Sequence, residues 1–216
     1  MLDVMNTLPT LPYGAWPSQL SAARAGSAAI GLNHVRSSAL GLLWIETRPA
    51  EKGRAVLMRR DPNGALQELT PPDFIARTRV HEYGGLPYAC AGDSVLVARD
   101  ADQRLCRLVP GTAPEPLTAA GLRWADGDAI GDSGATVWVR EDHRAGGEPG
   151  NAIVRLDADA PAGAEGEVLY GASDFVAYPR VSRDGRHLAF IAWDHPDMPW
   201  DATRLMVGEL GPAGLT

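Results

Sequence analysis

A short pattern recurs four times along the 216-residue chain and limits its fold more than any other feature. Each copy has a turn of polar residues or glycine, an apolar strand, a charged loop and a second strand. The four apolar strands begin at Leu43, Val95, Val137 and Ala189, at successive offsets of 52, 42 and 52 residues. Units of this length that hold about four antiparallel strands are typical of β-propeller blades. A β-sandwich with coincidental spacing is the alternative.

The segments on either side of these strands are also alike. Turns suited to tight reversals precede them, for example at residues 91–94 and 183–186. The second strands of the repeats are expected at residues 55–60, 104–108, 152–156 and 204–210. We therefore predict an all-β protein, a β-propeller with about four blades of four antiparallel strands each.

The repeats divide the chain into an N-terminal extension, residues 1–29, and a propeller region, residues 30–216. The predicted blades span residues 30–76, 77–121, 122–175 and 176–216. Within the extension, residues 17–26 predict a short helix, with Ser18 or Ser21 as its N-cap and Gly26 just beyond its end.

Charge and composition argue against several kinds of partner. The formal net charge is −7 and Lys52 is the single lysine, so neither a nucleic acid nor an anionic membrane is an expected partner. The longest apolar run, residues 39–45, is too short to cross a bilayer, and the first residues lack the pattern of a secretory signal. We expect a soluble cytoplasmic protein in which Cys90 and Cys106 are free thiols.

No metal site is predicted. The three histidines of interest lie in expected loops: His81, His143 and His195. Equivalent loops of successive blades are spaced around a ring, whereas zinc needs three or four convergent ligands. The acidic stretch 126–132 lacks the glycine and glutamate positions of a calcium-binding loop. We expect no cofactor.

Five strings carry a more specific signal: residues 13–18 (YGAWPS), 77–85 (RTRVHEYGG), 102–105 (DQRL), 123–126 (RWAD) and 193–200 (WDHPDMPW). In this order they resemble the N-terminal propeller of bacterial prolyl oligopeptidase family serine peptidases, of the acylaminoacyl-peptidase and dipeptidyl-aminopeptidase type. In that family a propeller of more than four blades precedes an α/β-hydrolase domain and screens substrates by size. The resemblance implies a peptide substrate and a hydrolase domain of the same polypeptide as partners.

The chain itself lacks the catalytic signature of such a hydrolase. That signature is Gly-x-Ser-x-Gly at a strand-to-helix elbow. The segments around Ser133 and Ser173 come near to it, but both lack the final glycine and belong to predicted turns. No catalytic residue carries over, and we expect a fragment that is inactive alone. A free-standing propeller that serves as an interaction scaffold is the alternative function.

With more than four blades in the family, these four should form an open arc of a larger propeller, and each end blade should leave an apolar face uncovered. Propeller topology places the loops between second and third strands on the side where the chain enters each blade. These segments, residues 48–54, 99–104, 142–151 and 194–203 together with 79–85, should form one rim.

We predict that this rim docks on the hydrolase. Its candidate contact residues are His81, Tyr83, His195 and Trp200. Glu82 is the candidate to pair with a substrate amine. Plain solvated loops, and an ion pair of Glu82 with Arg77, Arg79 or another neighbour, are the alternatives.

Overall fold

The computed structural model describes residues 10–27, 29–211 and 214–216, and nearly all of its regular structure is β-strand. The strands form four antiparallel sheets of four strands each, taken in chain order. Sheet 1 contains β1 (Gly31–Ser38), β2 (Gly41–Arg48), β3 (Arg54–Arg60) and β4 (Leu66–Glu68). Sheet 2 contains β5 (Tyr88–Ala91), β6 (Ser94–Ala98), β7 (Leu105–Leu108) and β8 (Glu115–Pro116).

The other two sheets repeat this order. Sheet 3 contains β9 (Leu122–Ala129), β10 (Thr136–Asp142), β11 (Gly150–Leu156) and β12 (Glu167–Tyr170). Sheet 4 contains β13 (Phe175–Val181), β14 (His187–Trp193), β15 (Arg204–Gly211) and β16 (Gly214–Leu215). The strands predicted from the repeats are β2, β6, β10 and β14, each followed by its predicted partner. The predicted fold class is confirmed.

Apolar side chains fill the spaces between successive sheets. Leu43 and Leu57 of sheet 1 pack with Tyr88 and Val97 of sheet 2. Comparable clusters lie between sheets 2 and 3, around Trp124 and Trp138, and between sheets 3 and 4, around Ile153, Leu188 and Phe190. Burial of these faces supplies the main force that stacks the sheets.

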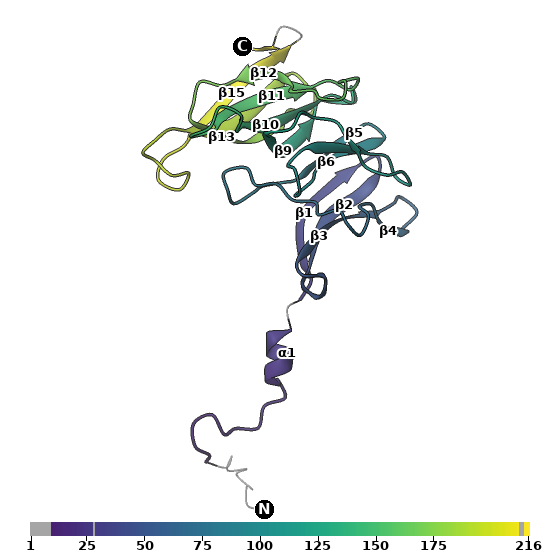
Figure 1. Ribbon diagram of the computed structural model, residues 1–216, viewed down its shortest axis with the longest axis vertical. Helices are drawn as coiled ribbons and strands as arrows, with labels where there is room; N and C mark the ends of the chain where they lie inside the picture. Colours follow the sequence, from purple (N-terminus) through teal and green to yellow (C-terminus); the bar gives the residue numbers. More distant parts are fainter. Residues whose placement is uncertain (1–9, 28, 212–213) are drawn as a thin grey trace, which may run out of the picture.

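The stack is an open arc, with sheet 1 and sheet 4 at opposite ends (Figure 1). Leu32 on β1 is 66% exposed and Leu205 on β15 is 71% exposed, and their neighbours Val35 and Val207 are exposed as well. In a closed propeller these positions would lie between blades. The two end sheets therefore present uncovered apolar faces, as the sequence predicted.

Residues 10–27 of the N-terminal extension project away from the sheets (Figure 1) and carry one short helix, α1 (Ala22–Gly26). Ser21 is its N-cap, accepting a hydrogen bond from the Arg24 backbone N–H. The prediction of a helix from residue 17 was too long, because the Ser18 hydroxyl bonds to the backbone of Leu20 and holds a turn instead. Gly26 is the last helical residue, not the residue beyond it.

Cys90 and Cys106 are both free thiols, and burial raises the pKa of each. Among the helices of the described residues, none is long and apolar enough to span a membrane.

Candidate functional site

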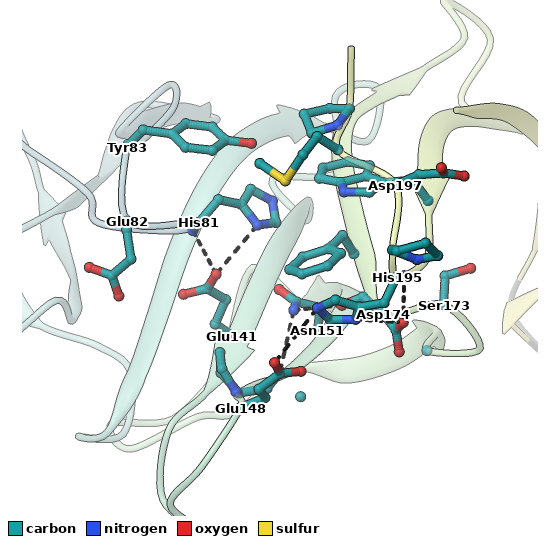
Figure 2. Close-up of a pocket in the computed structure, with 18 residues that line it drawn as sticks. His81, Glu82, Tyr83, Glu141, Glu148, Asn151, Ser173, Asp174, His195 and Asp197 are labelled. Atoms are coloured by element: carbon teal, nitrogen blue, oxygen red, sulfur yellow. Dashed lines mark hydrogen bonds and ion pairs between the residues drawn. The ribbon is translucent and has the colours of Figure 1, made fainter. Parts of the chain in front are cut away.

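A cavity of about 570 Å³ opens between sheets 3 and 4. Its lining comes from five parts of the chain: residues 81–83 between sheets 1 and 2, Glu141 on β10, residues 148–151 at the start of β11, residues within 171–175 leading into β13, and residues within 193–199 from the end of β14 onward. The segment that leads toward sheet 2 and two loops between second and third strands thus meet at this cavity (Figure 2).

Four of the five residues singled out from the sequence line this cavity: His81, Glu82, Tyr83 and His195. Figure 2 shows them on two sides of the opening. The fifth, Trp200, lies farther along the loop that carries His195; it is 73% exposed and is not among the lining residues.

Glu82 lies at the mouth of the cavity, with its side chain 77% exposed. One of its oxygens, Oε1, accepts a hydrogen bond of 2.6 Å from Nη1 of Arg123, on β9. This guanidinium lowers the pKa of the Glu82 carboxyl, so the group is ionised at neutral pH. Its ion-pair partner is therefore Arg123, a neighbour in space, rather than Arg77 or Arg79.

Aromatic rings form the apolar wall of the cavity. Phe175 and Trp193 are stacked, with ring centroids 5.3 Å apart and an interplanar angle of 13°. The His81 ring lies 5.3 Å from Trp193 and 5.7 Å from Tyr83, and the His195 ring lies 4.9 Å from Phe175. Such a wall can bury an apolar side chain and can also face a cation.

His195 is held by two carboxylates. Its Nδ1 lies 2.9 Å from Oδ2 of Asp174, and its Nε2 lies 3.6 Å from Oε1 of Glu148. The hydrogen bond to Asp174 raises the pKa of His195. In turn, the backbone N–H and the ring of His195 lower the pKa of Asp174. The pair fastens the loop after β14 to the start of β13.

The cavity has a strongly acidic character. Five of its lining residues carry carboxylates: Glu82, Glu141, Glu148, Asp174 and Asp197. Among the described residues that line it there is no lysine and no arginine. The arrangement suits a ligand with a cationic end beside an apolar group. Within the described ranges, no three His, Cys, Asp or Glu side chains converge in a way that could hold a metal ion.

Glu141 and Asp174 were not predicted as site residues. A signal for Glu141 was available, because residues that alternate along a strand share a face. Val137, Val139 and Glu141 alternate along β10 and all three are buried. A carboxylate at such an inward position needs a partner. Asp174 precedes β13 in a segment without a distinctive pattern.

No protein family model matches the chain, and no curated protein matches it either. Several solved structures, however, match it. The fold and the cavity define a partial β-propeller with a ligand-sized site on its loop-bearing side. Two bacterial TolB structures, from Acinetobacter baumannii and Agrobacterium tumefaciens, match at 14% and 16% identity with TM-scores of 0.52 and 0.54. They show the propeller fold alone.

More similar is a puromycin-hydrolyzing peptidase of Mycobacterium tuberculosis, with 36% identity and a TM-score of 0.82 over 96% of this chain and 33% of that one. A puromycin hydrolase matches at 34% identity and a TM-score of 0.80, over 96% of this chain and 34% of that one. The chain thus spans about a third of the length of these peptidases. The resemblance is confirmed: the chain is like the propeller portion of prolyl oligopeptidase family peptidases.

Proposed function

We propose that the chain is the non-catalytic propeller portion of a serine peptidase of the prolyl oligopeptidase family, and that its cavity receives the free amino end of a peptide. A hydrolase domain of the same polypeptide would then cleave the bound substrate. The similarity to puromycin-hydrolyzing peptidases, of whose length this chain covers a third, supports the domain arrangement.

The observation that carries the proposal is the joint placement of Glu82 and the aromatic wall. An ammonium group seated at the mouth donates a charge-assisted hydrogen bond to the Glu82 carboxylate, which Arg123 keeps ionised. The first side chain of the peptide can then lie against Phe175 and Trp193. An acetylated amino end has neither the charge nor all the donors for this contact.

The same geometry supports a role in selecting substrates by size. A cavity of about 570 Å³ accommodates a few residues of peptide and excludes a folded chain. The proposed role of this part of the propeller is therefore to admit small substrates and to orient them by their amino end. Orientation lowers the entropic cost of the later chemical step.

The coding sequence beyond Thr216 provides a first test. Further blades followed by a Gly-x-Ser-x-Gly elbow are expected. A stop codon at that point would favour a free-standing interaction scaffold and contradict the proposal.

Binding provides the second test. We expect the 216-residue chain to bind phenylalanyl-alaninamide, and Glu82→Gln to weaken this binding about tenfold, since one charge-assisted hydrogen bond is worth roughly 1.5–3 kcal/mol. The N-acetylated form should bind weakly to both. The matched control is Glu165→Gln, which removes another exposed, arginine-paired carboxylate outside the cavity. Equal affinity for the free and the acetylated peptide would refute amine recognition.

A further inference from the structure

Glu141 has a carboxylate that is almost completely buried in the cavity wall, with its side chain 3% exposed. Its two oxygens contact different neighbours, and Figure 2 shows the contacts of one of them with His81. Oε1 accepts the backbone N–H of His81 at 2.6 Å and lies 3.5 Å from Nδ1 of the same histidine. Oε2 lies 2.9 Å from Nε2 of His143 and 3.9 Å from Nη1 of Arg123. A single side chain of β10 thus contacts the segment that bears Glu82.

That segment has an unfavourable backbone. His81 and Glu82 are consecutive residues with φ of +54° and +64°, in the left-handed region that residues with side chains rarely adopt. Two such residues in a row persist only where their surroundings hold them. The hydrogen bond from His81 N–H to Glu141 is one anchor, from sheet 3. The contact of His81 Nε2 with the carbonyl oxygen of Val176, at 3.0 Å, is another, from sheet 4.

Glu141 is also linked to the Glu82 side chain through Arg123. Nη1 of Arg123 donates to Oε1 of Glu82 at 2.6 Å and to the carbonyl oxygen of Arg79 at 2.8 Å. The same nitrogen lies within 3.9 Å of Glu141. Glu141 therefore holds the backbone that carries Glu82 and attracts the cation that orients its carboxylate.

The stability of the fold gives little reason for a carboxylate at position 141. Burial of a charge is costly, and apolar residues of similar volume often replace buried ion pairs without loss of stability. We propose that Glu141 is a positioning residue for amine binding: it sets the left-handed turn at His81 and Glu82, and thereby the site of the amino end. This inference rests on the function proposed above.

The test uses two variants of the 216-residue chain. Glu141→Leu fills the space but removes every acceptor, whereas Glu141→Gln keeps one acceptor for His81 N–H. We expect the affinity for phenylalanyl-alaninamide to fall about tenfold in Glu141→Leu and two- to fivefold in Glu141→Gln, with no change for the acetylated form. If the leucine variant does not fold, the inference is tested by the glutamine variant alone, in which affinity for the free peptide should fall and affinity for the acetylated peptide should not change. Unchanged affinity in the folded variants, or equal losses for both peptides, would overturn the inference.

The matched control is Thr136→Val, at the opposite end of β10. It removes the acceptor of the buried Trp138 Nε1–H and so perturbs the same strand without contact to the segment. We expect it to weaken neither peptide selectively.

Hydrogen exchange separates this inference from the proposed function. If the unmodified chain does not distinguish the two peptides, amine recognition fails, but the positioning role is still measurable. The amide of His81 should exchange at least tenfold faster in Glu141→Leu than in the unmodified chain and in Thr136→Val, and faster in Glu141→Gln by a smaller factor. Equal rates in all four proteins would show that Glu141 does not hold the turn.

Discussion

Oδ2 of Asp174 accepts two hydrogen bonds from His195, one from its backbone N–H and one from Nδ1 of its ring, both of 2.9 Å. One carboxylate oxygen thereby fixes the position and the ring orientation of a residue in the loop after β14. The contact is strongest when His195 is protonated and Asp174 is ionised, so the order of the loop should depend on the protonation of the two groups. This loop forms one side of the cavity.

The first prediction concerns pH. The raised pKa of His195 means that its contribution to loop order is fully present below about pH 6.5 and is lost as the pH rises through the raised value. The lowered pKa of Asp174 means that its contribution is present above about pH 4 and is lost as the pH falls through the lowered value. The contact should therefore be strongest between these limits.

Hydrogen-exchange protection of residues 194–203, corrected for intrinsic rates, should decrease between pH 6 and pH 9. In Asp174→Asn this decrease should be much smaller, and an NMR titration should show a lower pKa for His195. Protection that is the same at both pH values in the unmodified chain would contradict this prediction.

The second prediction concerns the close approach of Gly127 to a buried ring. A Cβ atom at Gly127 would lie 2.6 Å from two ring carbons of Trp138. This indole is fully buried, and its Nε1 donates to Oγ1 of Thr136 at 2.8 Å, so it cannot move aside easily. Gly127→Ala should lower the free energy of unfolding by about 1–3 kcal/mol, as measured by urea denaturation.

Gly150→Ala is the control, because a Cβ there meets no atom within 4 Å. It should change stability by less than about 0.5 kcal/mol. Equal effects of the two substitutions would show that the ring does not restrict Gly127.

The third prediction concerns the uncovered faces of the arc. The apolar side chains exposed on β1 and β15 should drive self-association of the isolated chain, so sedimentation coefficients should rise with concentration. Leu205→Gln combined with Val207→Thr should reduce this association. The control is Leu66→Gln with Val168→Thr, which alters exposed residues of the outer strands β4 and β12. A monodisperse monomer at all concentrations would show that these apolar faces do not drive self-association.

The second and third strands of each sheet could be predicted from the sequence, because their apolar runs are regular and recur. The first strands could not. Sheets 1, 3 and 4 each have an irregularity in the register of the first strand, near His34, Asp126 and Tyr178. All three residues have a left-handed backbone conformation. An extra residue reverses the inward and outward sides, so no alternating pattern runs along these strands.

The candidate site could be predicted in part. His81, Glu82, Tyr83 and His195 were selected because propeller topology and the family motifs place their loops on one rim, and all four line one cavity. The partners were not predictable, because Arg123 and Glu141 reach this segment across 41 and 60 positions of sequence. Such contacts depend on the angle between sheets, which no local pattern determines.

Orientation of peptide substrates by their amino end is tested most directly in a polypeptide that also carries the proposed hydrolase domain. The measurement is KM and kcat for a peptide with a free amino end and for its acetylated form, in the unmodified protein and in Glu82→Ala. We predict that KM for the free peptide rises about tenfold while KM for the acetylated peptide and both kcat values change little, as expected for the loss of one charge-assisted contact. An equal rise in KM for the two peptides would contradict the claim.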